Sequence, residues 1–139
     1  MTYSHPFSRF KLRIKSSLVI GAAVSLPGYV YFRVNALGNG FSEICVFAAV
    51  VFFCGMFWGW VFDSALNKPG TSGIMWFFGS AYLISALTGI LSGSIFFPGL
   101  GSIGGLIAST AIFFNGKIFV AWFFAFAVAR LAILAMKRY

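Results

Sequence analysis

Charge is scarce in this chain, and acidic charge is almost absent. Only 9% of its 139 residues are charged, and the acidic ones number two, Glu43 and Asp63. A soluble domain carries about 25% charged residues, so this composition excludes an ordinary soluble globular fold. With 60% hydrophobic residues and a mean hydropathy of +0.96, we expect an integral membrane protein.

The residues that catalysis and metal binding need are also missing. His5 is the single histidine, and no acid lies within the middle of a long apolar run. A histidine metal or haem site, or a carboxylate proton relay inside the membrane, therefore lacks its side chains. Cys45 and Cys54 would lie about 13 Å apart on a continuous helix, too far for a disulfide. We expect a non-enzymatic protein with no catalytic residue, no metal and no cofactor.

Long apolar runs dominate what is present. A membrane-spanning helix needs about 20 apolar residues, and four runs approach or exceed this, at about 17–32, 41–62, 73–97 and 118–136. A shorter run at about 102–114 suits a half-helix. The fold prediction is an all-α integral membrane protein, one transmembrane domain over 1–139. It has four transmembrane helices, with a Gly-rich turn and half-helix before the last span.

The basic residues predict orientation and a lipid contact. Four spans place most of them on one side, whereas five spans would move Lys137 and Arg138 across. The positive-inside rule favours four, with both termini cytoplasmic. We expect a bacterial inner membrane, with an organellar membrane as the alternative. Residues 1–17 are predicted to form a basic arm on anionic headgroups, through Arg9, Lys11, Arg13 and Lys15. We expect no nucleic-acid partner, because the basic residues flank apolar runs.

Small residues recur at every fourth position, which places them on one helix face where backbones approach closely. Such stripes predict packing within one bundle or association with another membrane chain, either a second copy or another subunit. The candidate interface residues are Ala81, Ser85, Gly89, Gly93, Gly55, Gly59, Ala121, Ala125 and Ala129.

Polar and charged residues near the apolar runs suggest two further features. Ion pairs are possible between Asp63 and Arg130 at one side and between Arg33 and Glu43 at the other. A solute path is possible through the glycine turn, using Gly99, Gly101, Gly104, Gly105 and Ser92. The G-x-G-x-x-G spacing there is no dinucleotide fingerprint, because no acid follows Asp63 in the chain.

Three functions are compatible with these residues. The favoured one is a non-enzymatic membrane component that acts through helix–helix association in assembly, anchoring, immunity or defence. The second is a homo-oligomeric channel or small-solute transporter that uses the glycine turn and hydroxyl residues: Ser80, Ser85, Thr88, Ser92, Ser109 and Thr110. The third is a supernumerary subunit of a large membrane complex.

Overall fold

Helices make up nearly all of the described chain. The computed structural model describes residues 6–34 and 40–137, which are 91% helical and contain no strand. The helices are α1 (Pro6–Val34), α2 (Phe41–Val61), α3 (Asp63–Leu66), α4 (Gly70–Phe96), α5 (Gly101–Phe114) and α6 (Gly116–Met136). The all-α prediction is therefore confirmed. His5, Arg138 and most of the stretch between the first two predicted spans lie outside the described residues.

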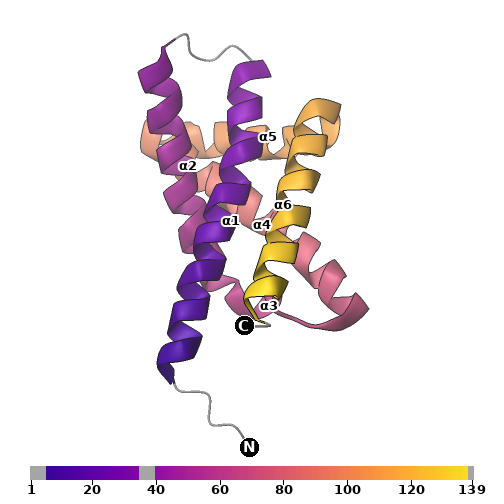
Figure 1. Cartoon of the computed structure of the whole chain (residues 1–139). Helices are drawn as coiled ribbons and strands as arrows, with labels where there is room; N and C mark the ends of the chain where they lie inside the picture. Colours follow the sequence, from indigo (N-terminus) through magenta and orange to yellow (C-terminus); the bar gives the residue numbers. More distant parts are fainter. Residues whose placement is uncertain (1–5, 35–39, 138–139) are drawn as a thin grey trace, which may run out of the picture.

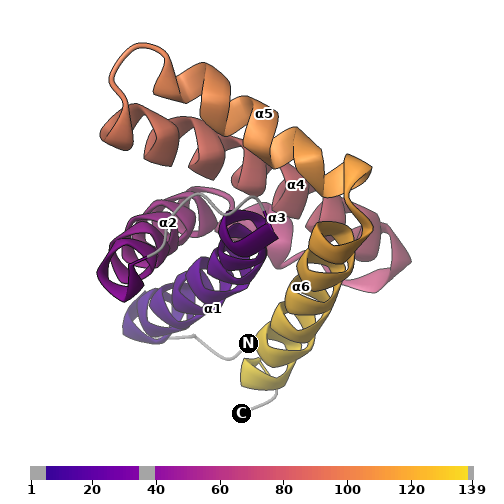
Figure 2. The ribbon, with the colours of Figure 1, turned by 90° about the horizontal axis from the view of Figure 1, so that it is seen from above.

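The helices form two layers. Helix α1 lies between α2 and α6, and α4 and α5 run side by side across these three (Figures 1 and 2). One end of the bundle contains the start of α1, the end of α6 and the short helix α3 (Figure 1). The connection between α1 and α2 is at the opposite end. We call the first the α3 end and the second the loop end.

Three helices are long and apolar enough to cross a membrane: α2, α4 and α6. Helix α5 is apolar but only 14 residues long, as expected for the half-helix. Helix α1 is not in this set, since Lys15 and Arg33 bound its apolar part and Ser, Gly and Pro residues interrupt it. The structure thus supports an integral membrane protein, with three helices that are long and apolar enough to span.

The first residues of α1 differ from the arm expected from the sequence. Helix α1 starts at Pro6, continues through Pro27 and ends at Val34 without a break. Proline is favoured at the first helical position because its missing N–H has no partner there anyway, and the Arg, Lys and Leu residues that follow are good helix formers. The alternation of apolar and basic residues therefore does not prevent a helix here.

Aromatic side chains fill much of the core between α4 and α6. Phe77 and Phe126 are fully buried, with ring centroids 6.3 Å apart. The Trp122 indole is 5.3 Å from the Phe126 ring, and its Nε1 donates a hydrogen bond of 3.0 Å to Ser85 Oγ. This contact fixes α6 against α4 near the middle of the bundle.

Candidate binding cavity

Glycines set the distance between α4 and α5. Gly99, with φ of +94°, occupies the turn that folds α5 back along α4. A Cβ atom at Gly93 would collide with the Gly101 carbonyl, and one at Gly105 would collide with the Gly89 carbonyl. The two backbones are therefore in direct contact, which only glycine allows.

Gly89 and Gly93 belong to the longest small-residue stripe that the sequence contains. In the structure they face α5 of the same chain, and Ala81 and Ser85 of the stripe are buried. Packing within one bundle, one of the two interpretations of this stripe, is what the chain shows at these positions. Association with a second chain through these two glycines would require α5 to move away.

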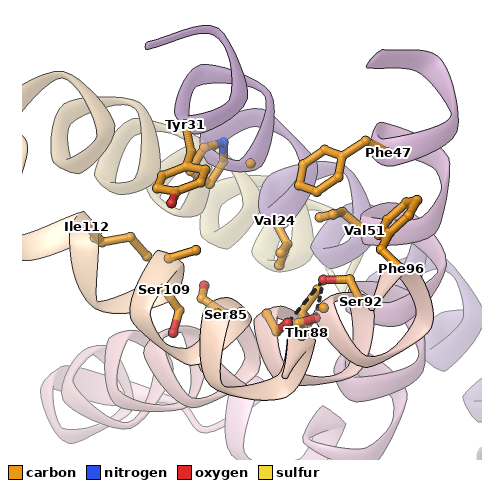
Figure 3. Close-up of a pocket in the computed structure, with 18 of the residues that line it drawn as sticks. Val24, Tyr31, Phe47, Val51, Ser85, Thr88, Ser92, Phe96, Ser109 and Ile112 are labelled. Atoms are coloured by element: carbon orange, nitrogen blue, oxygen red, sulfur yellow. Dashed lines mark hydrogen bonds between the residues drawn. The ribbon is translucent and has the colours of Figure 1, made fainter. Parts of the chain in front are cut away.

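A cavity of about 750 Å³ lies above this α4–α5 contact, walled by α1 and α2 (Figure 3). Its size is typical of small-molecule sites, which measure about 300–1,000 Å³. Figure 3 shows the hydroxyl residues of α4 and α5 on one side and apolar side chains of α1 and α2 on the other. The lining includes Val24, Pro27, Tyr31, Glu43, Val46, Phe47, Val51, Ser85, Thr88, Ser92, Phe96, Phe97, Gly101, Gly104, Gly105, Ser109, Ile112 and Ile118.

The hydroxyl side of the cavity contains one unpaired group. Ser85, Ser92 and Ser109 donate to backbone carbonyls of their own helices at 2.7–2.8 Å. Thr88 is 1% exposed, and its Oγ1 has no hydrogen-bond partner among the described residues. Buried polar groups are nearly always paired with protein, water or ligand. Thr88 Oγ1 is one of three that have no partner in the described chain, with Trp58 Nε1 and Asn67 Oδ1, and it is the one that belongs to a cavity-lining residue.

The mouth of the cavity opens between the first turns of α2 and the α4–α5 turn. The lining residues exposed there are Glu43, Val46, Phe96, Phe97 and Gly104. The rings of Phe47 and Phe96 stack across the opening with centroids 5.7 Å apart. The described lining residues include one carboxylate, that of Glu43, and no basic side chain.

Four of the five residues predicted for a solute path meet at this cavity. Gly101, Gly104, Gly105 and Ser92 line it, whereas Gly99 serves the turn and does not. The sequence did not reveal the opposite wall, including Tyr31, Phe47 and Glu43, because that wall depends on how α5 folds back toward α1 and α2.

The stripes of α1 and α2 pack against each other. A Cβ at Gly59 would lie 2.9 Å from the Cβ of Ile20 and 3.4 Å from the Cα of Ser17. One at Gly55 would lie 3.1 Å from Val24 Cβ and 3.4 Å from Gly21 Cα. These glycines therefore serve a second helix crossing within the chain. On α6, which packs on α1, Ala125 and Ala129 are buried and Ala121 is half-buried.

Arg130 binds backbone at the α3 end, not the predicted acid. It is 9% exposed, and its guanidinium donates to the carbonyls of Leu66 at 3.1 Å and Lys68 at 3.2 Å. Asp63 instead accepts hydrogen bonds from Ser16 Oγ at 2.8 Å and Asn67 Nδ2 at 2.7 Å. The two side chains form no ion pair in the described structure, because the end of α3 and the turn after it present their carbonyls to Arg130.

Two more basic residues donate hydrogen bonds to backbone carbonyls at the α3 end. Arg13, predicted to bind headgroups, turns inward: its Nη2 donates to the Trp60 carbonyl at 2.9 Å and its guanidinium lies 4.5 Å from the Trp60 ring centre. Lys137 Nζ donates to the Asn67 carbonyl at 2.8 Å. Burial lowers the pKa of Lys137, a shift that Asp63 opposes and Arg130 increases.

The remaining charged residues lie on the surface. Arg9, Lys11 and Lys15 are exposed on the first turns of α1, in position to reach headgroups. Arg33 and Glu43 are both exposed, and the predicted ion pair between them is not formed in the described structure. Helix α2 begins with the Glu43 carboxylate leaning toward its own N-terminus, since the carboxyl carbon is 3.7 Å from a Cβ built on Gly40.

Cysteine, histidine and acidic residues do not gather anywhere in the described chain. No group of three such residues is placed to hold a metal ion within residues 6–34 and 40–137. Cys45 and Cys54 are free thiols on a continuous helix, as their spacing predicted. Comparison with protein-family models, curated proteins and solved structures found no match to this chain.

Proposed function

We propose that this chain is a non-enzymatic integral membrane protein that binds a small amphipathic molecule in the cavity, in the class of small-solute carriers. The observation that carries the proposal is a cavity of about 750 Å³ whose mainly apolar lining also contains hydroxyl residues of α4 and α5. Apolar walls with a few convergent polar groups are typical of ligand sites. The cavity supports the small-solute hypothesis over the other two as the function proposed here.

The proposed topology has four spans with both termini cytoplasmic. Helix α1 has 29 residues, more than the roughly 20 needed to cross, and it packs along α2 and α6 as a neighbouring span would. The basic residues of the α3 end outnumber Arg33 and Lys117 at the loop end, which favours a cytoplasmic α3 end. A fluorescent protein fused after Tyr139 should then fold and fluoresce in cells, and a dark, translocated fusion would overturn this orientation.

Association with other chains is less well supported as the main function. The glycines that suggested it, Gly89, Gly93, Gly55 and Gly59, contact helices of the same chain. A homo-oligomer or a subunit role would have to use other, lipid-facing surfaces. Native mass spectrometry of protein extracted in mild detergent measures this directly, as a multiple of 15.1 kDa or as a heavier complex.

The binding proposal is tested by filling the cavity. Ser92→Leu adds an apolar side chain to the lining, whereas Ser94→Leu changes a serine of the same helix that does not line it. Each serine donates to a carbonyl four residues earlier, so both variants lose a bond of this kind. Ser92 is the more buried of the two, and its hydroxyl also lies 3.3 Å from the Gly89 carbonyl. Small molecules that copurify with the protein should be retained by Ser94→Leu and lost from Ser92→Leu. Equal retention by both folded variants, or no bound molecule in the wild type, would contradict the proposal.

A further inference from the structure

The cavity mouth combines the only acid of the loop end with aromatic rings. Glu43, Phe96 and Phe97 are all exposed residues of the lining, and Tyr31 and Phe47 line the same cavity. A carboxylate attracts a cation, and the faces of aromatic rings attract it through their quadrupoles. Quaternary and protonated amines are the ligands that such mixed sites recognise.

The interior of the cavity suits the other part of an amphiphile. Val24 and Val51 are buried in its wall, and Phe47 and Ile112 add apolar surface. No basic side chain among the described lining residues could pair with an anionic group. The hydroxyl protons of Ser92 and Ser109 are already donated to carbonyls, and the Thr88 hydroxyl oxygen is buried. Below the mouth, the lining therefore offers a ligand mainly apolar surface.

We infer that the cavity binds a cationic amphiphile, with its ammonium group at Glu43 and the aromatic mouth and its apolar body within. This inference rests on the proposed function and adds the charge of the ligand to it. The ammonium could belong to a lipid headgroup or to a free lipophilic amine, and the chemistry at the mouth is the same for both.

Charge selectivity is a demanding test, because the whole protein carries a formal net charge of +8. Long-range attraction would draw anions to it. A preference for a cation must therefore come from the site itself. Tetraphenylphosphonium and tetraphenylborate have similar size and shape and opposite charge, so they make a matched pair of probes.

The experiment measures the affinity of both probes for the full chain in a nonionic detergent. The wild type should bind tetraphenylphosphonium more tightly than tetraphenylborate, and Glu43→Gln should weaken cation binding about fivefold, as expected for one partly exposed charge. The control moves the carboxylate by one residue: Glu43→Gln with Ser42→Glu keeps the net charge and the acidic first turn. Ser42 is exposed and does not line the cavity, so this variant should bind the cation as weakly as Glu43→Gln.

Competition separates the two sources of the ammonium. Displacement of the bound cation by a lysolipid with a choline headgroup, and not by one with a phosphoglycerol headgroup, assigns the site to a lipid headgroup. Failure of both lysolipids, with tetraphenylphosphonium still bound, assigns it to a free lipophilic amine.

Two results would overturn the inference: equal affinity for the two probes, or full cation binding by the variant with the relocated carboxylate. If a neutral or anionic molecule copurifies and is lost from Ser92→Leu, the charge assignment fails while the proposed function stands. If no molecule copurifies and neither probe binds, both fail.

Discussion

At the α3 end of the bundle, buried polar side chains hold the backbone of neighbouring helices, whereas at the loop end they line a cavity. Arg130, Arg13 and Lys137 each donate to carbonyls of α2, of α3 or of the segment between α3 and α4. Beside the cavity, Thr88 Oγ1 has no partner among the described residues, and Ser92 and Ser109 bond only within their own helices. The first arrangement fixes helix positions, whereas the hydroxyl groups of the second mostly bond within their own helices and line a cavity.

The shape of the loop end, where the cavity lies, depends on contact between backbones and not on side-chain hydrogen bonds between helices. Gly89 and Gly93 on α4 meet Gly105 and Gly101 on α5, and no Cβ fits at any of the four positions. The stability of the protein should therefore respond differently to mutations at the α3 end and at the loop end. The predictions below test that difference, from the largest expected effect to the smallest.

Gly105→Ala should have the largest effect. Its added methyl group would collide with the backbone of Gly89, which cannot turn aside as a flexible side chain could. Overpacking of this kind costs about 3 kcal/mol of unfolding free energy. The matched control is Gly104→Ala on the same helix, where a Cβ meets nothing within 4 Å. That control should be neutral or slightly stabilising because alanine favours helix, as measured by denaturant unfolding in detergent. Equal stability of the two variants would mean that α5 does not pack on α4 as described.

Arg130→Met should follow, at the opposite end. It leaves the carbonyls of Leu66 and Lys68 without their charged donor, and hydrogen bonds to charged groups contribute about 1.5–3 kcal/mol. We expect a loss of about 2 kcal/mol in the same assay. Arg130→Lys keeps the charge but cannot bind both carbonyls, so its stability should lie between those of the wild type and Arg130→Met. A wild-type-like Arg130→Met would show that this corner does not depend on the arginine.

Ser16→Ala tests a neutral donor at the same end. Ser16 is 1% exposed and donates to Asp63 Oδ1 across the α1–α3 contact. Its loss should cost about 1 kcal/mol. Ser25→Ala is the control, since that hydroxyl bonds only the Ala22 carbonyl of its own helix, and it should cost less. If Ser25→Ala destabilised the protein more than Ser16→Ala, the hydrogen bond from Ser16 to Asp63 would not contribute to the stability of the α3 end.

Sequence reasoning predicted local features of this fold better than it predicted their partners. The spacing of four identified Gly55, Gly59, Gly89 and Gly93 as close-packing positions, and the structure places each against another backbone or a Cβ. The spacing carries no information on which helix lies opposite. The stripe of α4 meets α5 only because the turn at Gly99 folds the chain back, a tertiary event that helical periodicity does not encode.

Arg130 shows the same limit for charge. Its position in an apolar run and the presence of Asp63 on the same side suggested a pair, since both facts can be read from the chain. Arg130 binds backbone carbonyls, and every residue type has one. The sequence therefore gives no signal for which carbonyls an arginine will bind. The hydroxyl residues Thr88 and Ser92 were visible as a polar set, but the cavity was not, because its walls come from four helices and the start of a fifth.

Thr88→Val should have the smallest effect on stability and the opposite sign to the changes at the α3 end. Replacing an unpaired buried hydroxyl with a methyl group of similar size removes a polar atom that loses its water on folding and gains no bond. We expect the empty protein to be stabilised by up to about 1 kcal/mol, measured by denaturant unfolding after bound molecules are removed. Thr110→Val is the control: that hydroxyl donates to the Ile107 carbonyl and does not line the cavity, so its loss should be neutral or slightly destabilising. If Thr88→Val destabilises the empty protein more than Thr110→Val does, the Thr88 hydroxyl has a partner within the protein, and the contrast between the two ends of the bundle fails at its central residue.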